Sequence, residues 1–484
     1  VSKELVTPLD KAFYQRIQRI DRQTPYAAMV GSAEYAVRRI HLIQSAVKGD
    51  KPERKEAFEQ SVVFLFSRLY NGIPDSVARK FASIYYDYLQ WNKDPGKLSA
   101  RAEEFQKRLL DISVKSGSFN WLVSRAVYKT DDLTIADFLK GFHVSDSGFD
   151  ASVEGAYTKG GRERIQTFLD LIESVFPNHE KFIRMENRFW AWYENQFFKS
   201  WHDFLNAYPS GARWRTATDN WTELGPLMAT GHNPCFLFLE KMAEEIEAFK
   251  ARADQIPAWA DTALRLQHVA ELARMEKKKD KGSLVAKLEI KKEKLADRIF
   301  GKGDSKKYPE MDLNKAREID YNLVFAEHWN DYRDILQTLS PATSYAEKCY
   351  HMFSDYFAAI RNPQKEDNPF SNTADSLRKL KTLFSRLQES PEIFELIRGP
   401  FAYFKVYAVH HSAGVLQSKW EEIVLSASSG TDPDQYHSIM FDPDKGLVWK
   451  FVNKWADPFI TRNREGYMPK TAFGIRLPFT DRFF

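Results

Sequence analysis

Apolar side chains recur every three or four residues along most of this chain, the spacing at which they share one face of an α-helix. Phe13, Ile17 and Ile20 follow this spacing after Thr7 and Pro8, a favourable N-cap and first helical residue. The same periodicity predicts further helices over residues 32–48, 52–70, 74–91, 98–112, 161–176, 182–205 and 371–425, and a helical hairpin over residues 258–300.

Proline, glycine and short polar residues mark where these helices are expected to begin and end. We expect Ser32 to cap the second helix and Gly49 to close it. Residues 94–96, Asp-Pro-Gly, predict a turn. Pro391 predicts a helix N-terminus, and residues 399–400, Gly-Pro, predict a break in that helix.

Two regions depart from helical periodicity. Residues 113–160 carry short apolar pieces broken by Gly, Ser and Asp, which predicts loops with a few short strands or turns. After residue 426 the chain becomes rich in Gly, Pro and Asp, with a helix expected at residues 448–452 and strands within residues 466–484. The pattern as a whole predicts a mainly α fold of elongated, multi-domain helical bundles, with a small mixed α/β or loop-rich portion near the C-terminus.

These shifts in pattern divide the chain into four expected domains. Residues 1–130 form an N-terminal helical domain, and residues 131–250 a turn region followed by an aromatic-rich helical domain. Residues 251–345 hold a basic helical hairpin and a second Trp-containing helix, interpreted as a possible insertion. Residues 346–484 form a C-terminal helical domain with a loop-rich end.

Composition narrows the class of protein. Hydrophobic residues are 43% and charged residues 28% of the 484 positions, which excludes a disordered or fibrous chain. The net charge of +4 argues against a dedicated nucleic-acid binder, and no apolar run approaches the ~20 residues of a membrane helix. Aromatic residues reach 14%, and those of residues 182–205 cover more than one helix face, which predicts a central element. Because the chain opens at Val1 without a signal-peptide pattern, we expect it to be a segment of a longer protein.

Motifs of known chemistry are missing from the sequence, and we therefore predict no enzyme, no catalytic residue, no cofactor and no metal site. Residues 301–305, Gly-Lys-Gly-Asp-Ser, lack the spacing of a phosphate-binding loop. His410 and His411 are adjacent and point to different faces of one helix, which disfavours chelation. Asp131 and Asp132 are interpreted as part of a turn and a helix N-terminus.

Cysteine usage leaves the cellular compartment open. Cys235 and Cys349 are the two cysteines of the chain, so a disulfide framework and a Cys-based zinc site are excluded. Two buried thiols are the favoured interpretation, and one disulfide between them is the alternative in an oxidising compartment. Residues 220–222, Asn-Trp-Thr, match the glycosylation sequon, which is a weak signal in isolation.

The hairpin carries the strongest local charge of the chain. Between Glu271 and Lys307 stand 13 basic and 7 acidic residues. Acids interspersed among lysines at three- and four-residue spacing are typical of a solvated helix face, which is the favoured interpretation. The alternative is a surface that binds nucleic acid or an acidic partner protein through this 271–307 hairpin, in a cytoplasmic helical adaptor.

Five further patterns follow one another in a fixed order. They are residues 153–161 (Val-Glu-Gly-Ala-Tyr-Thr-Lys-Gly-Gly), residues 193–205 with Trp201 and the pair Phe204 and Leu205, the Pro-led helices after Leu224 and Leu339, residues 416–424 around Trp420, and residues 441–459 from Phe441 to Phe459. In this order they resemble the periplasmic region of the IcmF/TssM family, the large inner-membrane subunit of the type VI secretion membrane complex. Glu154 stands where the family has proline. The resemblance covers about residues 130–484, and residues 1–130 agree with it only in being helical.

The resemblance implies a structural role. It suggests a periplasmic segment of a bacterial inner-membrane protein, which helps to build the envelope-spanning secretion channel through protein–protein contacts. The implied partners are further copies of the same subunit, the inner-membrane protein TssL and the outer-membrane lipoprotein TssJ, the last through a domain that lies outside these residues. It implies no nucleic acid and no small-molecule substrate.

Overall fold

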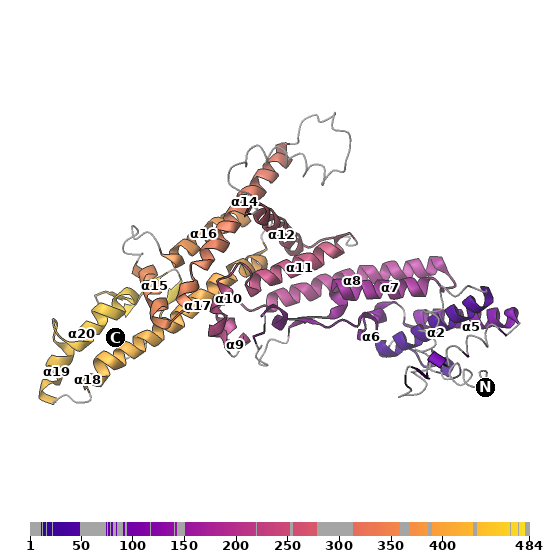
Figure 1. Ribbon diagram of the computed structural model, residues 1–484, viewed down its shortest axis with the longest axis horizontal. Coiled ribbons are helices and arrows are strands. Elements are labelled where there is room, and N and C mark those ends of the chain that lie inside the picture. Colours follow the sequence, from indigo (N-terminus) through magenta and orange to yellow (C-terminus); the bar gives the residue numbers. More distant parts are fainter. Residues whose placement is uncertain are drawn as a thin grey trace. The chain divides into compact units, whose positions relative to one another are not determined.

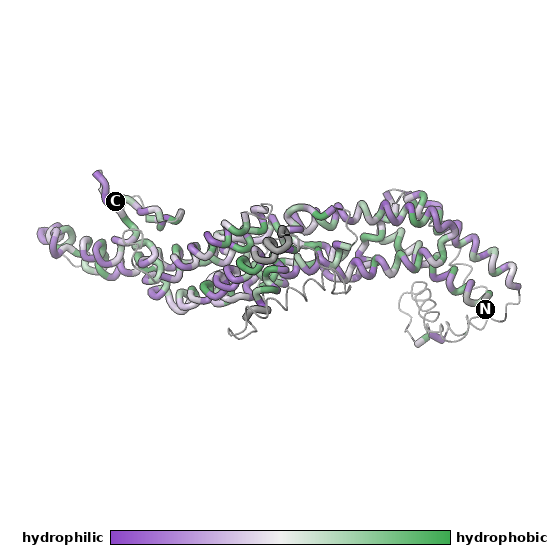
Figure 2. The backbone as a smooth tube through the Cα atoms, turned by 90° about the horizontal axis from the view of Figure 1, so that it is seen from above, coloured by the Kyte–Doolittle hydropathy of each residue, from purple (hydrophilic) through white to green (hydrophobic). Residues whose placement is uncertain are grey.

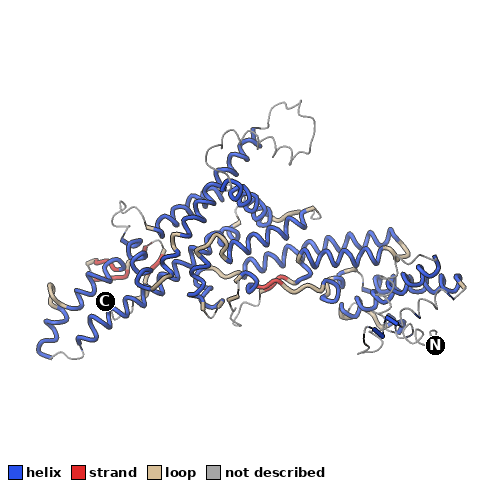
Figure 3. The backbone as a smooth tube through the Cα atoms, in the orientation of Figure 1, coloured by secondary structure: helices blue, strands red, loops and turns tan. Residues whose placement is uncertain are grey.

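The structure of the protein is a computed structural model, and helices dominate it (Figure 3), which confirms the mainly α prediction. It describes residues 11–48, isolated positions between 74 and 93, and residues 94–277, 313–358, 368–385, 390–428 and 433–479, apart from a few single residues and the gaps 143–150 and 252–254. The chain divides into two compact units. Unit 1 holds residues 1–133, 152–204 and 252–254, and unit 2 holds residues 134–151, 205–251 and 255–484.

Unit 1 is built from helices and a short strand pair. Helices α2 and α5 pack along each other (Figure 1), with Phe105 fully buried between them, its ring centroid 5.4 Å from that of Phe13. The short strands β1 and β2 pair with each other. The bounds are α2 (Tyr26–Lys48), α5 (Pro95–Ser116), η2 (Asn120–Leu122), α6 (Arg125–Tyr128), β1 (Leu133–Thr134), β2 (Ser152–Val153), η4 (Gly155–Tyr157), α7 (Lys159–Glu173) and most of α8 (His179–Ala207).

Two predicted helix starts in this unit are wrong. Ser32 is no N-cap, because α2 already begins at Tyr26 and the buried Ser32 hydroxyl donates to the carbonyl of Ala28 at 2.9 Å. Asp94 to Gly96 are not a free turn, because α5 begins at Pro95 and the Asp94 carboxylate accepts the backbone N–H of Lys97 at 3.1 Å. In both places a polar side chain bonds the helix backbone, and sequence alone leaves its position relative to the helix end open.

Unit 2 packs its longer helices around α17. The hydroxyl of the buried Tyr332 in α14 donates to the carbonyl of Ile397 in α17 at 2.9 Å. Tyr403 in α17 donates to the carbonyl of Trp221 at 2.8 Å. The larger elements are η3 (Ile135–Phe138), η5 (Gly211–Arg213), α9 (Trp214–Ala217), η6 (Trp221–Leu224), α10 (Gly225–Met228), α11 (Pro234–Lys250), α12 (Ala258–Lys277), α14 (Leu313–Gln337), η7 (Ser340–Thr343), α15 (Ala346–Ala358), α16 (Pro369–Phe384) and α17 (Pro391–Trp420).

The break predicted at residues 399–400 does not occur. Helix α17 begins at Pro391, as predicted, and runs unbroken to Trp420 with Pro400 inside it. A Cβ added at Gly399 would lie 2.7 Å from the Cys235 sulfur, so glycine lets α17 approach α11 closely. Both Gly399 and Pro400 are buried, and their packing outweighs the local cost of an interior proline, which is about 3 kcal/mol.

The C-terminal part of unit 2 is made of short elements, as predicted. Two antiparallel strand pairs form here, β3 with β4 and β5 with β6. Strands β4, β5 and β6 lie within residues 466–484, where strands were expected, and β3 precedes that range. The bounds are η8 (Glu421–Leu425), α18 (Ser426–Ser428), α19 (Pro433–Phe441), α20 (Leu447–Phe451), η9 (Val452–Ala456), η10 (Asp457–Phe459), β3 (Ile460–Arg462), β4 (Tyr467–Pro469), β5 (Thr471–Ala472) and β6 (Ile475–Arg476).

Hydrophilic and hydrophobic positions alternate along the helices (Figure 2), the pattern of elements that bury one face. Seven aromatic residues of the predicted central segment are buried in α8: Phe182, Phe189, Tyr193, Phe197, Phe198, Trp201 and Phe204. Among the described helices, none combines the length and the apolar character that crossing a bilayer requires.

Candidate functional site

Residues 153–161, the first segment of the resemblance, form a tight turn in unit 1. Strand β2 leads into the single turn η4, and Thr158 then caps α7 by accepting the N–H of Gly161 at 3.2 Å. A Cβ at Gly161 would lie 1.9 Å from the carbonyl oxygen of Gly155, and a Cβ at Gly155 would lie 2.5 Å from that of Thr130. Both contacts are with backbone atoms, so glycine is required at both positions.

Helix α8, the second segment of the resemblance, holds this turn from the other side. The hydroxyl of Tyr193 donates to the carbonyl of Ala156 at 2.6 Å, and the indole Nε1 of Trp201 donates to the carbonyl of Tyr157 at 3.0 Å. Tyr193 and Trp201 are fully buried. Each therefore satisfies a backbone acceptor that has lost its contact with water. We name the turn 152–161 together with these two side chains the α8 junction.

Asp131 and Asp132 do not start a helix, and this prediction is wrong. The N-cap of the following turn is Thr134, which forms a capping box with Asp137. Asp132 instead accepts the backbone N–H of Gly155 at 2.8 Å, and Asp131 forms an exposed ion pair with Arg125. Asp132 thus bonds the α8 junction, through a contact between residues 23 positions apart that sequence periodicity does not reveal.

The two Pro-led segments of the resemblance meet in unit 2. They form α10, which begins at Gly225, and η7, which ends at Thr343, and the two turns pack against each other. A Cβ at Gly225 would lie 2.5 Å from the Thr343 Cγ2, so a small residue is needed at the contact. The two helices after Leu224 and Leu339 are therefore partners in space as well as similar in sequence.

The last two segments of the resemblance also meet. The ring centroid of Trp420 lies 5.2 Å from that of Phe451, so residues 416–424 pack on residues 441–459. Phe459 is fully buried and reaches α15, where its ring lies 5.0 Å from that of Phe357 and 5.8 Å from that of Tyr350. In each of the three pairs of segments, the residues that carry the resemblance make packing contacts or hydrogen bonds.

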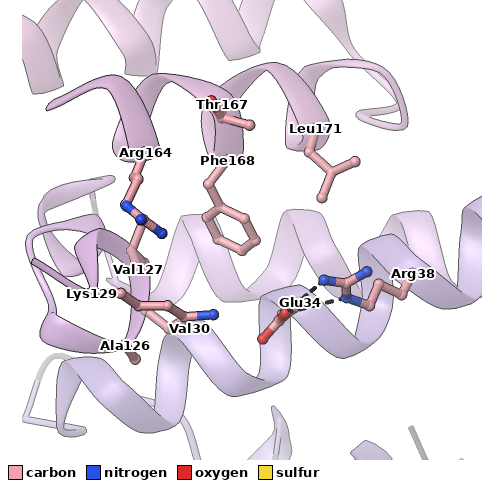
Figure 4. Close-up of a pocket in the computed structure, with 10 residues that line it drawn as sticks. All are labelled: Val30, Glu34, Arg38, Ala126, Val127, Lys129, Arg164, Thr167, Phe168 and Leu171. Atoms are coloured by element: carbon pink, nitrogen blue, oxygen red, sulfur yellow. Dashed lines mark hydrogen bonds and ion pairs between the residues drawn. The ribbon is translucent and has the colours of Figure 1, made fainter. Parts of the chain in front are cut away.

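A groove in unit 1 gathers charged side chains from three helices (Figure 4). It encloses about 230 Å³. Glu34 and Arg38 lie on α2, where they form an ion pair at 3.1 Å, and Lys129 follows the end of α6. The whole lining consists of Val30, Glu34, Arg38, Ala126, Val127, Lys129, Arg164, Thr167, Phe168 and Leu171. No sequence pattern pointed to this groove, because its residues come from three separate stretches of the chain.

The adjacent histidines lie on α17 as expected. Their ring centroids are 5.2 Å apart and the rings are nearly perpendicular. His410 is exposed and its ring lies 5.4 Å from that of Trp221. Burial lowers the pKa of His411, and the neighbouring His410 lowers it further. Among the described residues, no group of three or more His, Cys, Asp or Glu side chains is arranged to hold a metal ion.

The two cysteines are buried, free thiols in unit 2. Burial raises the pKa of each to about 12, so both stay protonated at neutral pH and neither has the reactivity of a thiolate. This matches the favoured sequence interpretation of two buried thiols.

Most of the basic hairpin lies outside the described residues. Helix α12 shows its first arm to Lys277, and residues 278–312, including the loop at residues 301–305, are not described. Asn220 of the sequon is exposed on unit 2. The proposed nucleic-acid surface of this hairpin therefore stays a prediction.

The chain was compared with models of protein families, with curated proteins and with solved structures. None of the three comparisons gives a match.

Proposed function

We propose that this chain is a structural segment of the periplasmic region of an inner-membrane subunit, similar to the IcmF/TssM family, in the membrane complex of a type VI secretion system. Its function is assembly: it contributes a helical body to the envelope-spanning channel through contacts with further copies of the subunit and with the inner-membrane partner TssL, whereas the contact with the lipoprotein TssJ is assigned to a domain outside these residues. No chemical step is assigned to it.

The observation that supports this proposal most strongly is that the five patterns of the resemblance, the third of which comprises two helices, form three pairs of packed segments. Residues 153–161 accept hydrogen bonds from two side chains of α8. The two Pro-led turns pack against each other, and residues 416–424 pack on residues 441–459. The residues that carry the resemblance thus maintain architecture, which is what an assembly protein requires. Buried, protonated thiols and a tyrosine such as Tyr157, whose pKa burial raises far above 10, are likewise suited to a packed core.

The test uses the full-length parent protein in its own host. The tagged protein is purified from detergent-solubilised membranes, and its partners are identified by mass spectrometry. Recovery of a small outer-membrane lipoprotein together with a second inner-membrane subunit is the expected result. Recovery of nucleic acid or of a metabolic complex contradicts the proposal and favours the adaptor hypothesis for the 271–307 hairpin.

A second measurement follows effector delivery. Deletion of residues 153–205 is expected to abolish delivery, because it removes the α8 junction from the scaffold. Gly161→Ala is expected to impair delivery strongly, whereas the matched variant Gly160→Ala keeps it, since a Cβ at Gly160 meets only the Thr130 methyl at an ordinary 3.5 Å. Normal delivery from the deletion strain would overturn the proposed function.

A further inference from the structure

The groove of unit 1 combines an apolar wall with positive charge. Phe168 and Leu171 project from α7 into the space above α2, and Val30 lines the opposite side (Figure 4). Phe168 and Leu171 are partly exposed although both are large and apolar. The groove therefore offers a surface onto which an apolar side chain from another molecule can pack.

The charges of the groove are unbalanced. Glu34 is the acidic residue of the lining, and it is already paired with Arg38. Lys129 and Arg164 are exposed at the same end of the groove, and no described residue forms an ion pair or hydrogen bond with either side chain. Two cationic groups are thus available beside the apolar wall, which favours an anionic ligand.

Lys129 adds a second observation. Its φ of +50° places it in the left-handed region, and among the described residues it is the single non-glycine residue there. It ends α6, at a position where glycine is usual and where a side chain costs about 1 kcal/mol. The lysine therefore occupies the mouth of the groove at a cost in backbone strain.

We propose that this groove docks a partner protein through a short segment in which a large apolar side chain adjoins a carboxylate. The apolar side chain packs on Phe168 and Leu171, and the carboxylate binds Lys129 and Arg164. A volume of about 230 Å³ holds one or two side chains and lies below the range of roughly 300–1,000 Å³ typical of small-molecule sites. The inference goes beyond the proposed function and does not depend on it.

The first experiment selects peptides from a random displayed library on the purified full chain. Peptides with Asp or Glu next to Phe, Leu, Ile or Met are expected to be enriched. The same selection on the double variant Lys129→Gln, Arg164→Gln is expected to lose them. Absence of enrichment, or enrichment that survives in the double variant, would overturn the proposal.

Affinity is then measured with the best enriched peptide by fluorescence anisotropy. The double variant is expected to weaken binding about fivefold or more, and replacing the peptide carboxylate by an amide is expected to have a similar effect. The control Lys107→Gln, Arg188→Gln removes two exposed cations from α5 and α8 of the same unit and is expected to leave affinity unchanged. An equal loss with the control shows unspecific charge attraction and contradicts the proposal.

Two further measurements distinguish peptide docking from a purely structural role of Lys129 and from the binding of small anions. Lys129→Gly relieves the left-handed strain, so it is expected to raise the midpoint of thermal unfolding while it weakens peptide binding. A variant that is more stable and binds the peptide as well as the wild type contradicts a binding role for Lys129. Inorganic phosphate is the second probe: if phosphate binds the groove and no peptide does, the site is one for small anions and the proposal fails.

Discussion

The α8 junction in unit 1 and helix α19 in unit 2 use aromatic residues in opposite ways. At the junction Tyr193 and Trp201 are fully buried and bond backbone carbonyls. On α19 Tyr436 is 41% and Phe441 is 44% exposed. The contrast shows that aromatic residues on a helix can either hydrogen-bond a buried turn or remain exposed at the surface. Contacts distant in sequence decide between the two outcomes.

The two regions also differ in how they use glycine. Gly155 and Gly161 leave no room for a Cβ against backbone atoms of the junction. On the C-terminal side, a Cβ at Gly446 would approach the carbonyl of Asp442 to 2.5 Å, within one local turn that Asp442 itself closes by accepting two backbone N–H groups. Glycine at position 155 allows close contact with Thr130, which is distant in sequence, whereas glycine at position 446 serves a turn of neighbouring residues. We therefore expect substitutions at the junction to destabilise the whole unit.

The largest effect is expected for Gly161→Ala. Its Cβ would overlap the Gly155 carbonyl oxygen, so the turn and α7 must separate, at a cost of about 3 kcal/mol or more in the free energy of unfolding. Urea unfolding followed by tryptophan fluorescence measures the loss. Gly160→Ala is the matched control and is expected to be neutral or stabilising by up to about 1 kcal/mol. Equal stability of the two variants would contradict the close packing of the junction.

Neighbouring residues of α19 provide the next comparison. Met440 is 1% exposed and Ile439 is 37% exposed. Met440→Ala is expected to lower the free energy of unfolding by about 2 kcal/mol, and Ile439→Ala by no more than about 0.5 kcal/mol. Hydrogen exchange of the α19 amides, measured for both variants, reports the local effect. Similar losses in the two variants would show that α19 packs differently from the structure.

A smaller effect is expected from one buried hydroxyl. Tyr193→Phe leaves the Ala156 carbonyl without its donor and is expected to cost about 1–2 kcal/mol in the free energy of unfolding. Tyr436→Phe removes an exposed hydroxyl from α19 and is expected to change stability by less than about 0.5 kcal/mol. Both are measured by urea unfolding. A larger loss for Tyr436→Phe would reverse the comparison between the two regions.

The smallest effect concerns pH. The pKa of His411 is lowered in the folded chain by burial, so the unfolded state binds a proton more readily. Its contribution to stability is present above the unfolded pKa of about 6.5 and is lost as pH falls through and below that value.

The unfolding free energy of the wild type should therefore fall more steeply between pH 7 and pH 5 than that of His411→Gln. The control His437→Gln replaces an exposed histidine of α19, and its curve is expected to run parallel to that of the wild type. Parallel curves for the wild type and His411→Gln would contradict the effect of burial on His411.

Local patterns anticipated the helices well where one face of the helix is buried. The aromatic segment 182–205 was predicted as a central helix and lies within α8, with Tyr193 and Trp201 fully buried. The wrong predictions concern residue types that occur both at helix ends and inside helices, such as serine and proline. Ser32 bonds a carbonyl inside α2, and Pro400 continues α17, because tertiary packing at these positions outweighs the local preference.

The candidate sites were less accessible to sequence analysis. Nothing in the local pattern placed Asp132 against Gly155 or brought Lys129 and Arg164 to one groove. A residue is recognised as part of a site from sequence only when its partners follow at a fixed spacing, as in metal or phosphate motifs. The partners of these residues lie on other helices and at no fixed spacing.

By itself, the sequence determined the mainly α class and the approximate position of helices such as α2, α5, α7, α8 and α17, since helical periodicity is a property of neighbouring residues. Only the tertiary structure decided which helices meet. Tyr403 bonds Trp221 across 182 positions, and Gly399 admits Cys235 of another helix. Such contacts depend on the three-dimensional approach of distant segments, and that approach is set by the packing of the whole unit and by no local preference.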